Sequence, residues 1–252
     1  MSTYVISDIH GALEPFQELL STIEFDADSE KDELYLLGDY ADWGKQSIET
    51  LGYIMDLDQS PHVHCIMGNH DLMFLQAIES YKLGASPDMN WYGNNKGYTT
   101  WDNYLRLSES NKEAIHDWLY SLDFAVDVRV GEKLYMAAHA YPYFGKRGKL
   151  GQIYTQSKAV WQRARYDEDP FIHYHGRKKY DALIIGHTPT AFYYYSRTGR
   201  IDDGAYRIFF GKKIIAIDCG AKLFDHPDMG PEYDKVRLGA LRLEDEKCFY
   251  VR

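Results

Sequence analysis

Three polar clusters, each directly after a short apolar run, dominate the first seventy residues of the chain. The apolar runs cover residues 4–6, 34–37 and 63–67, and the clusters that follow cover 7–11, 38–44 and 68–71. Stretches with helical spacing separate them, so the pattern predicts strands that alternate with helices in a largely parallel sheet. In such sheets ligands bind outside the carboxyl ends of the strands, where all three clusters lie. The sequence therefore predicts one ligand site built from separate parts of the chain.

The remainder of the chain is predicted to be helical first and then rich in strands. Residues 82–122, which contain many Trp, Tyr and Asn, are expected to form a helical insert. Strands are predicted at 124–130 and 133–138, paired as a hairpin, and at 182–185, 208–210, 214–217 and 238–243. Two central mixed sheets packed face to face, with helices outside, would accommodate all of these strands. We therefore predict an α/β fold of four layers, α/β/β/α, with residues 1–252 in a single domain.

The charge of the chain limits its partners. The sequence holds 38 acidic residues against 28 Lys and Arg, a formal net charge of −10. Because broad contact with nucleic acid usually depends on a basic face, no extended nucleic-acid binding is expected. The same balance suits a phosphorylated substrate poorly, unless bound cations reverse the local field.

The cysteines and the first residues bear on the cellular compartment. Cys65, Cys219 and Cys248 lie far apart and include no Cys-x-x-Cys pair, which favours reduced thiols. The first residues lack the basic and apolar regions of a signal peptide, and no stretch approaches the eighteen or so apolar residues that a membrane helix needs. A cytoplasmic protein without a membrane partner is expected.

Residues that bind hard or borderline cations follow five of the apolar runs. The candidates for metal ligation are Asp8, His10, Asp39, Asn69, His139 and His187. Asp or Asn after a strand is more often a turn former when taken singly, so the prediction depends on finding these residues together. Mixed imidazole and oxygen ligands suit Mn, Fe, Zn or Ni rather than Ca, and the absence of Cys excludes a closed thiolate zinc site.

The clusters resemble the motifs of the calcineurin-like metallophosphoesterases, most closely the phosphoprotein phosphatase branch with its bacterial and lambda phage enzymes and its diadenosine tetraphosphatases. Residues 8–11 match Asp-x-His-Gly, residues 38–44 match Gly-Asp-x-x-Asp-x-Gly, and residues 68–71 match Gly-Asn-His-Asp/Glu. His139-Ala140 and Gly186-His187-Thr188 complete the set of five in the family's order, and Ile217-Asp218-Cys219-Gly220-Ala221 also resembles the Ile-Asp-x-Gly segment that closes the domain in that branch. The resemblance spans nearly the whole chain, and it lies in five motifs in order rather than in any one of them.

The resemblance implies two divalent metal ions, with Mn²⁺ first and Fe, Zn or Ni as alternatives. Asp8 and His10 would hold the first ion and Asp39 would bridge, and the ligands of the second ion would be Asn69, His139 and His187. A metal-bridging hydroxide would then attack phosphorus in line with the leaving oxygen.

Three further roles are implied by the same resemblance. His70, paired with Asp42, would act as general acid and protonate the leaving oxygen. Residues 161–163 are similar to the Trp-x-Arg of the bacterial enzymes, so Arg163, with Arg165 as second choice, would bind the substrate phosphate.

One position departs from the family pattern. Trp43 stands where that branch usually has an Arg that contacts the substrate phosphate. Lys45, Lys96 or Arg147 could supply the missing charge, or Trp43 could stack on a base or an aromatic leaving group. The substrate class is therefore left open.

The leading functional hypothesis is a phosphoprotein (Ser/Thr) phosphatase-like enzyme that acts on a phosphorylated protein or a small phosphorylated metabolite. The alternative within the family is a hydrolase of dinucleoside polyphosphates such as diadenosine tetraphosphate. The alternative from another class is a non-catalytic metal-binding interaction module, which measurable turnover would exclude.

Overall fold

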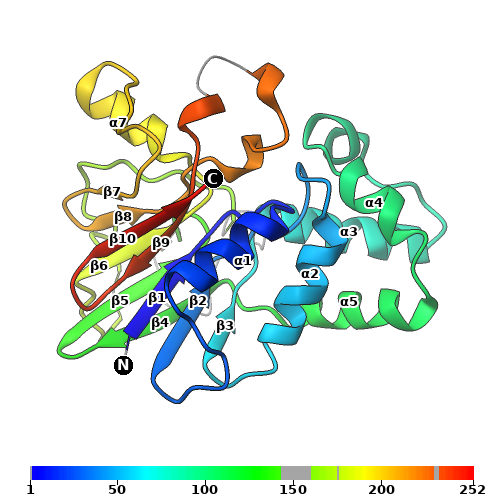
Figure 1. Ribbon diagram of the computed structural model, residues 1–252, viewed down its shortest axis with the longest axis horizontal. Coiled ribbons are helices and arrows are strands. Elements are labelled where there is room, and N and C mark those ends of the chain that lie inside the picture. Colours follow the sequence, from blue (N-terminus) through cyan, green and yellow to red (C-terminus); the bar gives the residue numbers. More distant parts are fainter. Residues whose placement is uncertain (1, 143–159, 175, 230–232) are drawn as a thin grey trace.

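Two five-stranded sheets form the centre of the computed structural model, which describes residues 2–142, 160–174, 176–229 and 233–252 (Figure 1). Helices cover the outer faces of the sheets, so the protein has the four-layer α/β/β/α architecture that the sequence predicts. None of the described helices is long and apolar enough to cross a membrane.

The first sheet has the strand order β10-β9-β1-β2-β3. Its strands are β1 (Ser2–Ile6), β2 (Asp32–Leu36), β3 (Val63–Cys65), β9 (Leu238–Arg242) and β10 (Lys247–Val251). The strands β1, β2 and β3 are parallel, whereas β9 runs antiparallel to both β1 and β10. Its helices are α1 (Leu13–Thr22), α2 (Ser47–Leu57) and α3 (Asn69–Lys82).

The second sheet has the order β4-β5-β6-β8-β7, with β5, β6 and β8 parallel and both edge strands antiparallel. Its strands are β4 (Ala125–Val130), β5 (Lys133–Ala138), β6 (Ala182–Ile185), β7 (Phe209–Phe210) and β8 (Ile214–Ala216). The hairpin of β4 and β5 agrees with the prediction.

The layers follow from the alternation of side chains along the strands. On β1, Val5 points between the two sheets, whereas Ile6 points toward the cluster that contains Phe16 of α1. On β6, Ile184 lies between the sheets and Leu183 lies on the opposite face, against the layer that contains α7 (Thr190–Thr198). Both faces of each central sheet are therefore apolar and covered.

The segment predicted as a helical insert contains three helical elements. They are the π-helix η1 (Asn90–Asn94), α4 (Tyr98–Tyr104) and α5 (Glu109–Ser121). Trp91 stacks on Phe74 of α3 at a ring distance of 6.0 Å, and Trp101 stacks on Tyr104 at 5.4 Å. The aromatic residues of this segment thus pack it against α3.

Two elements differ from the sequence prediction. The prediction left out β10, an edge strand whose half-buried residues show no clean alternation of apolar and polar side chains. It also left out α7, whose run Tyr193-Tyr194-Tyr195 has a low helix propensity. The packing of Tyr193 against Phe209, with ring centroids 5.6 Å apart, favours the helix there.

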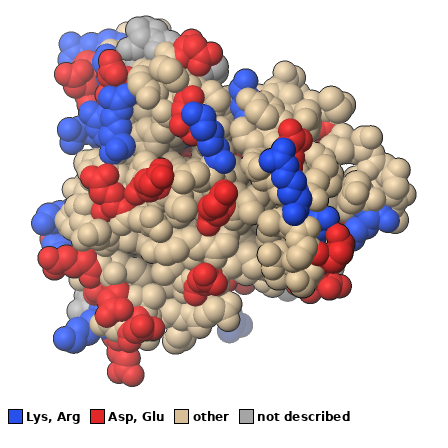
Figure 2. Space-filling model, turned by 45° about the vertical axis from the view of Figure 1, so that its right-hand side comes forward, with Lys and Arg blue, Asp and Glu red and all other residues tan. Residues whose placement is uncertain are grey.

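The molecular surface carries charges of both signs. On the face shown in Figure 2, Lys and Arg lie among Asp and Glu, separated by wide areas without charge. This face has no broad basic surface of the kind that nucleic acid requires.

Candidate active site

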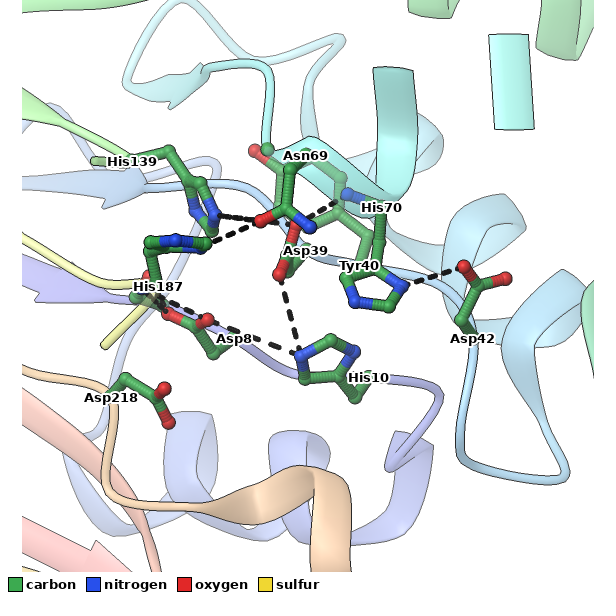
Figure 3. Close-up of polar contacts among 12 residues, drawn as sticks. Asp8, His10, Asp39, Tyr40, Asp42, Asn69, His70, His139, His187 and Asp218 are labelled. Carbon is green, nitrogen blue, oxygen red and sulfur yellow. Dashed lines mark hydrogen bonds and ion pairs between the residues drawn. The ribbon is translucent and has the colours of Figure 1, made fainter. Parts of the chain in front are cut away.

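The six candidate metal ligands meet where the carboxyl ends of the two sheets face each other (Figure 3). The first sheet supplies four of them after β1, β2 and β3, namely Asp8, His10, Asp39 and Asn69, and the second supplies His139 after β5 and His187 after β6. All six are buried, with 8% or less of their surface exposed. The structure therefore brings together the whole predicted ligand set.

Strained backbone positions carry most of these side chains. A left-handed backbone, with φ between 49° and 68°, is found at Asp42 and at four of the six candidate ligands. These four are Asp8, His10, Asp39 and His187. This conformation is unusual for residues with a side chain and costs on the order of 1–3 kcal/mol each. Loop hydrogen bonds hold it, for example from the Asp8 N–H to the Gly38 carbonyl at 3.1 Å.

Gly186 allows the two sheets to approach at the site. A Cβ atom at this position would overlap the Asp8 carboxylate and the Ser7 hydroxyl. The glycine lets the backbone N–H of His187 donate to the Asp8 carboxylate at 3.0 Å. A ligand from the first sheet is thereby fixed by the backbone of the second.

Asp71 organises the loops, although the sequence marks it only as the last position of a motif. Its buried carboxylate accepts hydrogen bonds from the backbone N–H groups of Asp39, Tyr40 and Gly68 at 2.7, 3.0 and 2.9 Å. Burial raises the pKa of Asp71 to about 6 against the lowering effect of these bonds. Asp71 thus ties the loop after β2 to the start of α3.

In His10 and His139, the nitrogen Nε2 faces the site and has a lone pair that can bind a cation. His10 Nδ1 lies 3.0 Å from the Ala41 carbonyl and His139 Nδ1 lies 2.8 Å from the Leu37 carbonyl. Because a carbonyl only accepts, each Nδ1 is the donor and each Nε2 is an acceptor. His10 Nε2 faces Asp39 Oδ2 at 3.5 Å, and His139 Nε2 faces Asp39 Oδ1 at 3.4 Å. Lone pairs that face each other in this way are the arrangement in which a divalent cation can bind between them.

Asn69 and His187 complete the second of these groups. Asn69 Oδ1 lies 2.9 Å from His139 Nε2 and 2.7 Å from His187 Nδ1. The ligand atoms of Asp39, His139 and His187 all lie within 4.8 Å of one another, as do those of His10, Asp39 and His70. The site thus has two groups of ligands that share Asp39.

Burial governs the pKa values of the ionisable candidate ligands, which are called the cluster below together with Asn69 and Asp218. It raises the pKa of Asp8 and Asp39 well above the usual range, and neighbouring carboxylates add to the rise. It lowers the pKa of His10 and His139 well below the usual range and that of His187 to about 3. Neutral imidazoles beside buried carboxylates are the donor set that divalent cations bind, so the residues fit such ions.

His70 and Asp42 form the predicted pair. His70 Nδ1 lies 2.7 Å from Asp42 Oδ2, and the ring centroids of His70 and His10 are 4.8 Å apart. A carboxylate only accepts, so His70 Nδ1 is the donor and Nε2 is the nitrogen left for a substrate.

Two residues of the segment predicted as a helical insert also bind Asp42, and no motif marks either of them. Trp91 Nε1 donates to Asp42 Oδ2 at 2.6 Å, and the Thr100 hydroxyl donates to Oδ1 at 2.6 Å. Asp42 is fully buried, and these bonds satisfy both of its oxygens. No local sequence signal joins residues 42, 91 and 100, although the Trp content of the segment points to buried indoles.

Asp218 is a further carboxylate of the site, although the sequence analysis gave it no role. It follows β8, and Figure 3 shows it beside Asp8. Its Oδ1 accepts a hydrogen bond from the backbone N–H of Gly220 at 2.9 Å. Burial raises its pKa, whereas the charge of Lys222 counteracts the rise.

The two predicted phosphate-binding arginines differ in their surroundings. The Arg163 guanidinium lies over the Phe192 ring at 5.9 Å, and its charge acts on His187 and Asp218, so it lies near the site. The Arg165 guanidinium pairs with Asp167 at 3.3 Å and is 74% exposed. Of the two, the structure directs only Arg163 to the site.

Two of the other cations considered for the phosphate, Lys45 and Lys96, contact Asp225 and Tyr98. Lys45 is 80% exposed and lies 3.7 Å from Asp225, and Lys96 lies over the Tyr98 ring at 6.0 Å. Arg147 falls outside the described residues.

Comparison with known sequences identifies the family. The calcineurin-like phosphoesterase family matches residues 1–191, about three quarters of the chain. A symmetrical bis(5'-nucleosyl)-tetraphosphatase of Pseudomonas fluorescens is 44% identical over 87 residues, and one of Chromobacterium violaceum is 41% identical over 81 residues. The matches cover 33% and 32% of this chain, and only 29% and 28% of those relatives.

Comparison with solved structures agrees on the fold. A metallophosphoesterase from Sphaerobacter thermophilus superposes with a TM-score of 0.54 at 16% identity, over all of this chain and 89% of that one. A protein serine/threonine phosphatase from Saccharomyces cerevisiae gives a TM-score of 0.59 at 13% identity, over 96% of this chain and 72% of that one. With the family matched over most of the chain and the fold shared with its members, this protein belongs to the calcineurin-like phosphoesterase family.

Proposed function

We propose that the protein is a hydrolase of phosphate esters that uses two divalent metal ions. The observation that carries the proposal is the position of Asp39, whose two carboxylate oxygens face different histidines at 3.5 and 3.4 Å. One ion would be held by Asp8, His10 and Asp39. The second would be held by Asp39, Asn69, His139 and His187, with Mn²⁺ first and Fe, Zn or Ni as alternatives. When bound, two such ions lower the pKa of a water and neutralise charge on phosphate oxygens.

His70 would supply the proton for the leaving oxygen. Asp42 Oδ2 accepts a hydrogen bond from His70 Nδ1, with 2.7 Å between the two atoms, and this bond fixes the orientation of the ring. The proton would therefore pass from Nε2 to the leaving oxygen. Arg163 would bind a phosphate oxygen, since its guanidinium acts on His187 and has no carboxylate within 4 Å among the residues that the structure describes.

Two substrate classes are candidates. A phosphoprotein or small phosphomonoester is the first, and it agrees with the complete His70 and Asp42 pair. A dinucleoside polyphosphate is the second, and it is favoured by the names of the bacterial relatives, which are symmetrical bis(5'-nucleosyl)-tetraphosphatases.

The test is hydrolysis of para-nitrophenyl phosphate, a phosphoserine peptide and diadenosine tetraphosphate by metal-stripped protein, with and without Mn²⁺. Turnover is expected only with the metal, and Asp39→Asn is expected to abolish it. Asp117→Asn, a change at an exposed carboxylate of α5, is the matched control and should keep wild-type turnover. Absence of turnover on all three substrates with Mn²⁺, Fe²⁺, Zn²⁺ and Ni²⁺ would favour the non-catalytic metal-binding module instead.

A further inference from the structure

Lys222 is a cation beside the candidate active site, and it forms no ion pair with any residue that the structure describes. It lies on the short 3-10 helix η2 (Ala221–Leu223), four residues after Asp218, and Figure 3 shows that the chain leaving Asp218 passes under His10. Its ammonium nitrogen lies 5.4 Å from the centre of the Trp43 ring. No carboxylate of the described residues lies within 4 Å of it, although Lys222 is half-buried.

The charge of Lys222 acts on four groups of the cluster. Burial is the largest influence on each of them, and Lys222 adds to the lowering of the pKa of His10 and His187. It also counteracts the rise in the pKa of Asp8 and Asp218. The geometry agrees, because Trp43, whose ring lies 5.4 Å from the ammonium nitrogen, precedes Gly44, and the Gly44 N–H donates a hydrogen bond to the His10 carbonyl at 3.0 Å.

Trp43 provides the support for this ammonium group. Its backbone is left-handed, with φ of 67°, and its carbonyl accepts a hydrogen bond from His226 Nε2 at 3.1 Å. The imidazole of His226 also meets the Trp43 ring edge to face at 5.4 Å. An indole held in this way attracts a cation to its face, and a desolvated cation most strongly.

We propose that Lys222, supported by the Trp43 ring, binds an oxygen of the substrate phosphate. This role rests on the proposed function, because Lys222 would contact the substrate of that reaction in the candidate active site. A phosphate group brings negative charge to a site that already contains Asp8, Asp39 and Asp218, so a cation of the chain would add to the positive charge that the metal ions supply. An ammonium group suits this task because it is a compact charge with three rotatable donors.

Arg163 and Lys222 reach the cluster from different parts of the fold. Arg163 lies against Phe192 of α7 and acts on His187, whereas Lys222 lies against Trp43 and acts on His10 as well. Both cations act on His187 and Asp218, and they do so from separate aromatic supports, Phe192 for Arg163 and Trp43 for Lys222.

The experiment measures binding of inorganic phosphate to the Mn²⁺-loaded protein by isothermal titration calorimetry, alongside hydrolysis of para-nitrophenyl phosphate. Lys222→Met is expected to weaken phosphate binding by about tenfold or more, the effect of losing one charged hydrogen bond. Lys222→Arg, which keeps the charge, should bind phosphate more tightly than Lys222→Met. Lys133→Met removes the charge of an exposed lysine that pairs with Glu246, and this variant should bind phosphate like the wild type.

The outcomes separate this role from the proposed function. Hydrolysis by the wild type together with unchanged phosphate affinity in Lys222→Met overturns the role of Lys222 alone. A wild type that neither binds phosphate nor hydrolyses the ester overturns both. Lys222→Ser removes the same charge without adding apolar surface, so a folding defect specific to Met would not mask the expected loss.

Discussion

Three histidines of the active site have the same arrangement of their ring nitrogens. His10, His70 and His139 each donate Nδ1–H to a fixed acceptor, which is a main-chain carbonyl for two of them and Asp42 for His70. Each therefore turns Nε2 toward the centre of the site. The Nε2 atoms of His10 and His139 are proposed to bind metal, and that of His70 is proposed to donate a proton. In all three residues the acceptor on Nδ1 orients the ring for this role.

Replacement of His70 by Asn tests the proton-donor role at this scale. A general acid matters most when the leaving group is a poor one, and it contributes on the order of 10²–10⁴ in rate. His70→Asn should therefore lose more activity on phenyl phosphate than on para-nitrophenyl phosphate. The measurement is kcat for both esters with Mn²⁺ present. Equal losses on the two esters would mean that His70 has a structural role instead.

Individual residues were predictable where a motif marks them. The six candidate ligands and the pair of His70 and Asp42 lie in short motifs whose residue types indicate metal binding and proton transfer. The structure brings these residues together. Thr100 carries no such mark, because it reaches the site only through a tertiary contact. Thr100 bonds to Asp42 across 58 positions of the sequence, a distance over which no local pattern extends.

The loops after the parallel strands are the elements that build the site, and the helical insert supports one of them. Trp91 and Thr100 are the contacts between the insert and the Asp42 carboxylate. The position of Asp42, and through it that of His70, therefore depends on elements outside the sheets.

Trp91→Phe tests this dependence. The change keeps the aromatic stacking on Phe74 but removes the hydrogen bond to the buried Asp42 carboxylate. A loss of about 1.5–3 kcal/mol in the free energy of unfolding is expected, together with slower hydrolysis of phenyl phosphate. Urea denaturation and kcat are the measurements. Trp101→Phe, in the same aromatic cluster but without a bond to Asp42, is the control, and equal effects of the two changes would argue against the role of Trp91.

The edge of the first sheet carries a pH-dependent cluster. Glu33 of β2 lies 3.0 Å from His62 Nδ1 and 2.7 Å from His64 Nε2. Burial acts to raise the pKa of Glu33, but the two hydrogen bonds and the charges of the histidines outweigh it and hold the pKa below the usual value. The folded state thus favours the ionised carboxylate.

Glu33→Gln should lower the free energy of unfolding by about 1 kcal/mol at pH 7. Because the pKa is lower in the folded state, the wild-type stabilisation is complete above the unfolded value of about 4.3 and is lost as the pH falls through the folded value. The difference between the two proteins should therefore shrink below about pH 4. Urea midpoints from pH 7 to pH 3 measure it, with Glu30→Gln as a control. A difference in the free energy of unfolding that stays constant over this range would contradict the claim that the ionised Glu33 carboxylate stabilises the fold.

Elements were predictable where their hydrophobic pattern is strong. The buried strands β1, β2, β5 and β6 are apolar runs bounded by turns, and the structure has all four. The strand β10 and the helix α7 were not predictable, because their sequences carry weak or contrary local preferences. Pairing with β9 and packing on Phe209 fix them, and both are tertiary effects.

The whole molecule contributes to the site in two halves. Asp8, His10, Asp39 and Asn69 come from the first sheet, whereas His139 and His187 come from the second. Hydrogen bonds across the halves, such as that of His139 with the Leu37 carbonyl, hold them in register. Metal binding should therefore depend on the assembled fold rather than on any single segment.

The most direct test is the number of Mn²⁺ ions that bind the metal-stripped protein, measured by isothermal titration calorimetry. Two ions per chain are expected for the wild type, because the ligands form two groups that share Asp39. Asp39→Asn should lose at least one of them or bind both far more weakly. A wild type that binds a single ion, or an Asp39→Asn variant that binds two ions as tightly as the wild type, would contradict the two-metal site.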